Sequence, residues 1–230
     1  MSRGEASPLP VEAAYRLWAE SYDEENPLTT LDRRAAVLLT PPLEGRTLLD
    51  SACGTARRLA FDGDAGPRLA AGVDLVFEML HRGRADAARR RTTAAGDLRA
   101  LPFPSSRFDV VWCRLAAGHL PVLAPLYREL ARVLAPGGKV IVTDFHPAAV
   151  AGGHRRVFRD ASGKSHLVTH VVHEPEAHER AAATEGLFLE SRIDLPIGAE
   201  VRLFWERANA MDRYERDRGL PLLLALRFRR

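Results

Sequence analysis

The run Leu48-Leu49-Asp50-Ser51-Ala52-Cys53-Gly54-Thr55-Ala56 constrains the fold of this chain more than any other segment. An apolar strand leads directly into a tight turn of small residues. A second strand then ends on an acid, Gly72-Val73-Asp74, about twenty residues after the turn. In doubly wound α/β sheets this combination forms the seat of an adenosyl nucleoside. The pattern therefore predicts such a sheet and a bound cofactor.

The length of 230 residues suffices for one well-buried core with room for a lid, so we expect a single domain over residues 1–230. The first residues contain no apolar signal core, and no apolar run reaches the length of a membrane span. These features predict a soluble, cytoplasmic protein with no membrane partner. The two cysteines, Cys53 and Cys113, lie in apparent buried strands, which fits reduced core thiols.

A basic run from Arg82 to Arg91 admits two interpretations. Clustered arginines bind polyanions, which would suit an enzyme that modifies RNA. The run lies, however, where a helix on the outside of the sheet is expected, and no aromatic residues interleave with it. We interpret it as a solvated helix face and expect no nucleic-acid partner.

Strand and helix signals alternate along the middle of the chain, which is typical of a parallel sheet. After the fifth strand the pattern changes, and the turn at 160–163 predicts an inserted β-hairpin. The last two strands are expected to close the sheet as an antiparallel pair. The expected strands are 47–50, 71–75, 92–96, 108–113, 139–144, 188–196 and 222–229, and the expected later helices are 121–134, 175–184 and 208–218.

Four parts of the domain follow from this pattern. Residues 1–40 form a helical flap, in which Tyr15, Trp18 and Tyr22 share one helical face. The remaining three parts are a cofactor-binding core over 41–145, a substrate-side insertion over 146–174, and a sheet-closing part over 175–230.

Five motifs in order resemble those of the class I S-adenosylmethionine-dependent methyltransferases, particularly the small-molecule group similar to the enzymes of ubiquinone and menaquinone biosynthesis. The resembling segments are 48–56, 72–80, 96–98 with 101–103, 108–111 and 130–138. The resemblance implies a Rossmann-like methyltransferase fold with a mostly parallel seven-stranded sheet. It also implies S-adenosylmethionine as the cofactor and methyl transfer to a small-molecule acceptor.

Several residues gain expected roles from this resemblance. The small turn at 52–54 would let the backbone approach the amino-acid portion of the cofactor. Asp74 would accept hydrogen bonds from the ribose hydroxyls and Asp97 from the adenine amino group. The full set of expected cofactor contacts is Tyr22, Asp50, Ala52, Cys53, Gly54, Asp74, Leu75, Met79, Asp97, Leu98 and Cys113. Because the family usually carries glycine at positions 52 and 56, we expect Ala52 and Ala56 to keep a negative φ, or the loop to be displaced.

Two histidines are candidate general bases, because ligands in open α/β sheets lie beyond the carboxyl ends of the strands. His119 follows the fourth strand and His146 the fifth, and His146 is preferred because Pro147 stiffens its loop. Imidazoles at both strand ends suit deprotonation of an acceptor. We therefore expect an oxygen or a carbon nucleophile, oxygen first, and nitrogen remains open.

Six of the eight histidines fall between His146 and His178, a density that raises the question of a metal site. In a strand, His166 and His170 would share one face and His173 would point to the other. We therefore expect no bound metal.

Three alternatives remain. One is a protein that binds the cofactor without turnover, suggested by Ala52 and Ala56, and another is an RNA methyltransferase. A nicotinamide dehydrogenase ranks well below a methyltransferase, because the first turn offers only Gly54 where that class needs more glycines. The sequence leaves the acceptor and the oligomeric state open.

Overall fold

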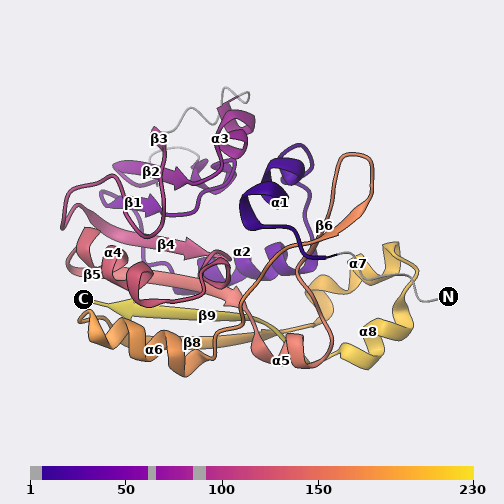
Figure 1. Cartoon of the computed structure of the whole chain (residues 1–230). Helices are drawn as coiled ribbons and strands as arrows, with labels where there is room; N and C mark the ends of the chain where they lie inside the picture. Colours follow the sequence, from indigo (N-terminus) through magenta and orange to yellow (C-terminus); the bar gives the residue numbers. More distant parts are fainter. Residues whose placement is uncertain (1–6, 62–65, 85–91) are drawn as a thin grey trace.

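The computed structural model describes residues 7–61, 66–84 and 92–230, and its centre is a seven-stranded sheet (Figure 1). The strand order is β3-β2-β1-β4-β5-β9-β8. The first five strands run parallel, and β9 is antiparallel to both β5 and β8. This confirms the predicted doubly wound, mostly parallel sheet. The strands are β1 Thr47–Asp50, β2 Leu69–Asp74, β3 Thr92–Ala95, β4 Phe108–Arg114, β5 Leu134–Phe145, β8 Phe188–Pro196 and β9 Pro221–Arg229.

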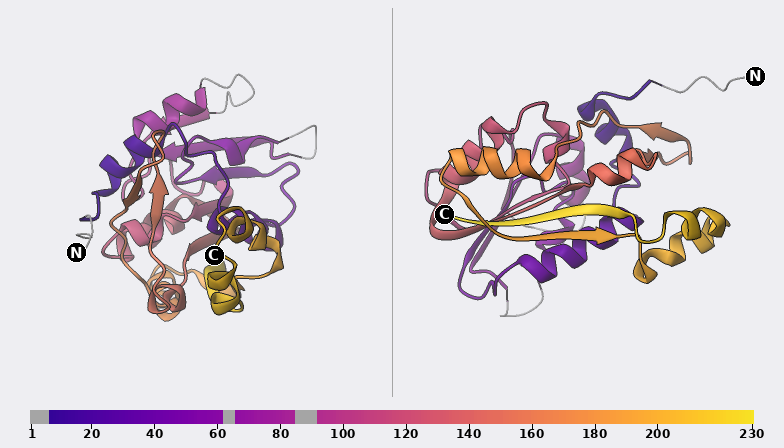
Figure 2. Two further views of the ribbon diagram at one scale, coloured as in Figure 1. Left: turned by 90° about the vertical axis from the view of Figure 1, so that its right-hand side faces the viewer. Right: turned by 90° about the horizontal axis from the view of Figure 1, so that it is seen from below.

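Helices cover both faces of the sheet because its central strands are apolar on both sides. Successive side chains of a strand point to opposite faces, so Val111 and Val110 of β4 belong to two different core clusters. Helices α4 (Ala124–Val133) and α6 (Pro175–Thr184) pack on the first face, and α2 (Pro27–Leu39) packs on the second. Figure 2 shows these layers from two further directions.

Within residues 7–40, the helical flap is shorter than expected, because α1 (Val11–Trp18) stands apart from the sheet whereas α2 packs against it. Leu31, Ala35 and Leu39 of α2 are buried in the core, since a spacing of four residues keeps them on one helical face. Asn26 caps this helix by accepting a hydrogen bond from the backbone N–H of Thr29 at 3.0 Å.

The predicted β-hairpin insertion after the fifth strand is present and holds α1 in place. It consists of β6 (Val157–Arg159) and β7 (Ser165–Leu167), which follow the short helix α5 (Pro147–Ala151). The ring of Trp18 on α1 stacks on Phe158 of the hairpin with centroids 5.0 Å apart. The sheet end is therefore covered by two segments that lie far apart in sequence (Figure 1).

The structure differs from the expectation at the start of one strand and near the last helix. Strand β5 begins at Leu134, five residues earlier than expected. The helix expected at 208–218 is present as α8 (Met211–Asp217). A further helix that was not expected, α7 (Arg202–Arg207), precedes it, and Asn209 between the two adopts a left-handed φ of 50°.

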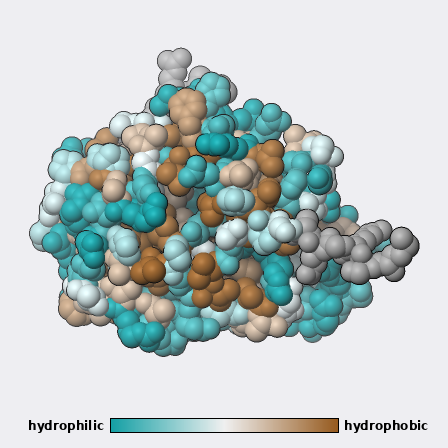
Figure 3. Space-filling model, viewed as in Figure 1, coloured by the Kyte–Doolittle hydropathy of each residue, from teal (hydrophilic) through white to brown (hydrophobic). Residues whose placement is uncertain are grey.

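Part of the basic run lies outside the described residues. Arg82 and Arg84 belong to α3 (Phe77–Arg84) and are exposed, whereas residues 85–91 are not described. On the face shown in Figure 3, hydrophobic side chains gather in the middle and hydrophilic ones surround them. Within the described ranges, no helix is long and apolar enough to span a membrane.

Gly83 of α3 is a position where a single methyl group should destabilise the protein. A Cβ built there would lie 2.2 Å from the carbonyl oxygen of Thr55, in the loop after β1. Because backbone atoms cannot yield easily, Gly83→Ala should lower the free energy of unfolding by about 2–3 kcal/mol. Chemical denaturation measures this effect. Arg82→Ala, on the exposed side of the same helix, is the control and should change stability by less than about 0.5 kcal/mol.

Candidate active site

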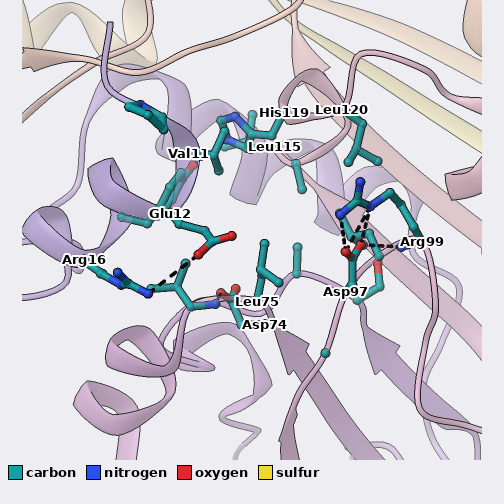
Figure 4. Close-up of a pocket in the computed structure, with 18 of the residues that line it drawn as sticks. Val11, Glu12, Arg16, Asp74, Leu75, Asp97, Arg99, Leu115, His119 and Leu120 are labelled. Atoms are coloured by element: carbon teal, nitrogen blue, oxygen red, sulfur yellow. Dashed lines mark hydrogen bonds and ion pairs between the residues drawn. The ribbon is translucent and has the colours of Figure 1, made fainter.

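A cavity of about 490 Å³ lies at the carboxyl ends of β1, β2 and β4, with α1 forming one wall (Figure 4). In this view Glu12 and Arg16 come from α1, while Asp97 and Arg99 lie across the open space from them. Of the site residues predicted from sequence, the structure brings seven to the walls of this cavity. These are Tyr22, Ala52, Asp74, Leu75, Asp97, Leu98 and His119.

Asp74 ties the wall of the cavity together. One carboxylate oxygen accepts the backbone N–H of Gly54 at 2.7 Å, and the other accepts that of Val76 at 2.9 Å. Burial raises the pKa of Asp74, although both N–H groups favour the charged form. Because each carboxylate oxygen can accept more than one hydrogen bond, the side chain can still bind a ligand hydroxyl in the cavity.

The loop after β1 is clamped by the segment that follows α1. A Cβ on Gly54 would lie 2.9 Å from Cε1 of Tyr22, and Gly54 itself has a φ of 58°, so glycine is required twice over. Thr55 donates a hydrogen bond from Oγ1 to the carboxylate of Asp23 at 2.6 Å. Burial of the phenol raises the pKa of Tyr22. The segment after α1 and the loop after β1 are therefore held together by these contacts.

The expected negative φ holds for Ala52 but is wrong for Ala56, which adopts φ 56° and ψ 18°. Ala56 begins the short 3-10 helix η1 (Arg57–Leu59) and is buried. A left-handed alanine costs about 1–2 kcal/mol. The chain tolerates this strain and keeps the loop in the backbone conformation that glycine would adopt.

Asp97 is held by its own loop. Its carboxylate accepts a backbone hydrogen bond from Arg99 at 2.8 Å and pairs with the Arg99 guanidinium (Figure 4). Arg99 lowers the pKa of Asp97. The carboxylate is therefore ionised and fixed beside Leu98 at the cavity wall.

Four predicted contact residues lie behind the wall instead of on it. Asp50, Cys53, Met79 and Cys113 are buried and do not line the cavity. The sulfur of Cys53 points toward Gly72 of β2, where an added Cβ would lie 2.7 Å from it. Asp50, Cys53 and Cys113 face away from the cavity because alternate residues of a strand and turn point to opposite sides, whereas Met79 is buried on α3. Gly54 contributes through its backbone N–H to Asp74.

His119 lies at the cavity wall in a hydrogen-bonded chain with a defined direction. Arg156 can only donate, and its NH2 group lies 3.2 Å from the hydroxyl oxygen of Tyr15. The Tyr15 hydroxyl lies 2.8 Å from Nε2 of His119, so it donates its proton there, and Nδ1–H of His119 then faces the carbonyl oxygen of Thr169 at 3.4 Å. Burial and the charge of Arg156 lower the pKa of His119 to about 3. The imidazole is therefore neutral.

His146, the preferred candidate base in the sequence, does not line the cavity. Its Nδ1 accepts the backbone N–H of Ala148 at 3.0 Å, which caps α5, and its Nε2 faces Asp194 of β8 at 3.5 Å. The chain turns into a helix directly after Phe145, and this turn directs the imidazole back to the helix backbone.

Three further histidines, in or just after the inserted hairpin, form hydrogen bonds or ion pairs with neighbouring residues. The expectation that His166 and His170 share a strand face was wrong, because β7 ends at Leu167. His166 pairs with Asp160 at 2.7 Å, His170 lies 3.4 Å from Asp144, and His173 faces the carbonyl oxygen of Leu120 at 2.8 Å. In the described part of the chain, no group of three or more potential ligands is arranged to hold a metal ion.

A buried ion pair beneath the cavity was missed by the sequence analysis. Arg114 at the end of β4 donates to both carboxylate oxygens of Asp32 on α2, at 3.2 and 2.7 Å. Thr143 donates to the same carboxylate at 2.6 Å and accepts the backbone N–H of Leu115 at 3.1 Å. Leu115 lines the cavity with a left-handed φ of 57°. A signal was present in the sequence, because Asp32 interrupts the apolar stripe of α2.

Asp32→Ala should lower the free energy of unfolding by about 3 kcal/mol, because it leaves Arg114 buried without its carboxylate. Asp32→Asn should cost less, and Glu24→Ala, at an exposed acid, should have little effect. Arg114 lowers the pKa of Asp32, so the unfolded chain takes up this proton at a higher pH than the folded one. The stabilisation is therefore present above about pH 4 and lost as the pH falls. Chemical denaturation from neutral to acid pH should show that the free energy of unfolding falls less steeply in Asp32→Asn than in the wild type.

The fold and the cavity define a class of α/β proteins that bind a nucleoside beyond the carboxyl ends of parallel strands. Comparison with known proteins makes this class specific. Residues 49–142 match the methyltransferase domain family. The 27-O-demethylrifamycin SV methyltransferase of Amycolatopsis mediterranei is 30% identical over 91% of this chain and 77% of its own length. The chain therefore belongs to the class I S-adenosylmethionine-dependent methyltransferases, in their small-molecule group, and is an enzyme that uses S-adenosylmethionine.

Two further relatives support this assignment. The malonyl-(acyl-carrier protein) O-methyltransferase of Pseudescherichia vulneris is 35% identical over 58% of this chain, which spans 52% of that enzyme. The crystal structure of an S-adenosylmethionine-dependent methyltransferase from Mesorhizobium loti shares the fold with a TM-score of 0.63. It is 22% identical, and the match covers 86% of this chain and 96% of that one.

Proposed function

We propose that this enzyme methylates a small-molecule acceptor at an oxygen or a carbon atom, oxygen being preferred, and that His119 acts with Tyr15 as the general base. The observation that carries the proposal is the directed chain from Arg156 through Tyr15 to His119 at the cavity wall. This replaces His146 as the base.

The residues of the cavity fit S-adenosylmethionine. Asp74 can accept from ribose hydroxyls, Asp97 can accept from an adenine amino group, and Leu75 and Leu98 offer apolar wall beside them. The small side chains of Ser51 and Ala52 leave room for the amino-acid portion. When bound, this cofactor supplies an electrophilic methyl group on a sulfonium.

The directed chain sets the route of the proton. An acceptor hydroxyl beside Tyr15 gives its proton to the phenol oxygen while the phenol passes its own proton to Nε2 of His119. Nδ1–H of His119 already faces Thr169, so Nε2, which accepts the hydrogen bond of Tyr15, is the nitrogen that takes the proton. The rest of the acceleration comes from holding the acceptor close to the methyl group and excluding water, a role that α1 and the hairpin suit.

The geometry of the loop after β1 removes the reason for the alternative of a binding protein without turnover. It was suggested by Ala52 and Ala56, yet Ala56 takes the left-handed conformation and leaves the loop in contact with Tyr22 and Asp74. We also propose a cytoplasmic location and an acceptor other than nucleic acid. The two free, buried thiols suit a reducing compartment, and the RNA alternative predicts strongly salt-dependent RNA binding.

Calorimetric titration with S-adenosylmethionine and S-adenosylhomocysteine is the first test. The proposal predicts saturable binding of both at micromolar concentrations, followed by methylation of hydroxylated acceptors in a screen that uses labelled cofactor. Absence of binding at millimolar ligand would refute the cofactor site. Tight binding without transfer to any acceptor would favour a binding protein instead.

A further inference from the structure

A second cavity, of about 750 Å³, lies near the first: the two have no lining residue in common among the described residues, but side chains from one wall contact side chains from the other. Its walls come from α5, the β6–β7 hairpin, the segment that follows the hairpin, and α8. Two side chains of the second cavity contact residues that line the first. Arg156 lines the second cavity and donates to Tyr15 of the first, while His170 lines the second and contacts the His119 ring edge-on with centroids 5.8 Å apart.

The charge of this second cavity is one-sided. Four arginines and two histidines line it, and none of its described lining residues is acidic. Arg216 is neutralised by Asp217, whereas Arg155 donates to the backbone carbonyl oxygens of Val150 and His154. In the described residues Arg156 and Arg213 form no ion pair either, which leaves three guanidinium groups beside one cavity without a carboxylate partner. Such a concentration of positive charge attracts anions.

The remaining walls are apolar. They include Phe145 at the end of β5, Val150 on α5, and Leu167 and Val168 of the hairpin segment. An occupant must therefore present an apolar body to these side chains and an anionic group to the arginines. A guanidinium group binds both carboxylate and phosphate through paired N–H donors.

We propose that the methyl acceptor is an amphipathic organic anion, whose carboxylate or phosphate is held by Arg155 and Arg213 while its nucleophile faces Tyr15 and His119. This inference rests on the proposed function, since it assigns the second cavity to the acceptor of the same reaction. Arg156, between the two cavities, then positions the acceptor relative to the directed hydrogen-bond chain. The anionic group is bound at a distance from the reacting atom and determines which acceptors enter.

Three probes with a common phenylalkyl body test this inference: phenylbutyrate, phenylpropyl phosphate and the neutral phenylbutyramide. Binding is measured by ligand-observed NMR titration with S-adenosylhomocysteine present. At least one anion should bind about tenfold more tightly than the amide, because a charge-assisted hydrogen bond contributes about 1.5–3 kcal/mol. Preference for the carboxylate identifies an organic acid and preference for the phosphate a phosphate ester. Binding of the amide as tightly as both anions would overturn the inference.

A double variant locates the effect. Arg155→Gln with Arg213→Gln should remove most of the preference for anions, at least about fivefold, and leave S-adenosylhomocysteine binding unchanged. The matched control is Arg207→Gln with Arg218→Gln, two exposed arginines outside the cavity that should keep the preference. An unchanged preference in the first double variant contradicts this site for the anion. Failure of the wild type to bind S-adenosylhomocysteine would instead refute the proposed function, so the two failures are distinguishable.

Discussion

Replacing Asp74 by alanine is expected to weaken the binding of S-adenosylmethionine at least about 100-fold, because two charge-assisted hydrogen bonds contribute about 3–6 kcal/mol. The carboxylate also holds the backbone N–H groups of Gly54 and Val76, at 2.7 and 2.9 Å. The substitution therefore removes the hydrogen bonds from Asp74 to the ligand and also loosens the loop that Asp74 holds. Isothermal titration calorimetry of the two proteins measures the difference.

Asp97→Ala should weaken cofactor binding less than Asp74→Ala does. Asp97 is already paired with Arg99, so its loss should weaken cofactor binding by about tenfold or less. Thermal unfolding without ligand separates a local loss of binding from a loss of fold. An affinity in Asp74→Ala equal to that of the wild type would contradict the assignment of this cavity to the cofactor.

His119→Ala is expected to lower kcat by about 100-fold or more while leaving the affinity for S-adenosylhomocysteine within about threefold, since general bases contribute roughly 10²–10⁴ in rate. Tyr15→Phe breaks the same chain at its hydroxyl and should lower kcat in the same direction. Single-turnover rates with the acceptor identified by the screen measure both. His146→Ala is a matched control because it removes an imidazole outside the cavity, and it should retain kcat within about threefold.

The pH dependence provides an independent check on His119. Burial lowers its pKa to about 3, so the imidazole remains unprotonated as the pH falls from 8 to about 5. The rate should therefore show no loss attributable to His119 across this range. A decline centred near pH 6.5 that disappears in His119→Ala would show instead that the histidine is solvated and titrates normally.

Local sequence pattern was sufficient to predict the sheet and much of the cavity wall. Leu48 and Leu49 identify a buried strand, and Gly54 and Asp74 are linked in the structure by a single hydrogen bond of 2.7 Å. These features depend on neighbouring residues, or on two strand ends that a parallel sheet brings to the same edge. The hairpin after the fifth strand was predictable for the same reason, since turn residues act locally.

The sequence did not show which of the two candidate histidines lies at the cavity. His119 and His146 both follow strands, and only the fold shows that one lies beside Tyr15 and the other caps α5. The partners that decide this choice, Tyr15 and Arg156, are more than one hundred residues apart in sequence. Such a pairing depends on how α1 and the insertion pack against each other.

The sequence by itself determined the doubly wound sheet, the hairpin insertion and the position of Asp74 at the end of the second strand, because periodicity and turn chemistry act over a few residues. Only the tertiary structure decided that α2 belongs to the core, that Asp32 pairs with Arg114, and that His119 faces the cavity. Each of these depends on side chains from distant segments that meet only when helices and loops pack on the sheet. The positions of the polar side chains around the cavity therefore depend on contacts between segments that are distant in sequence.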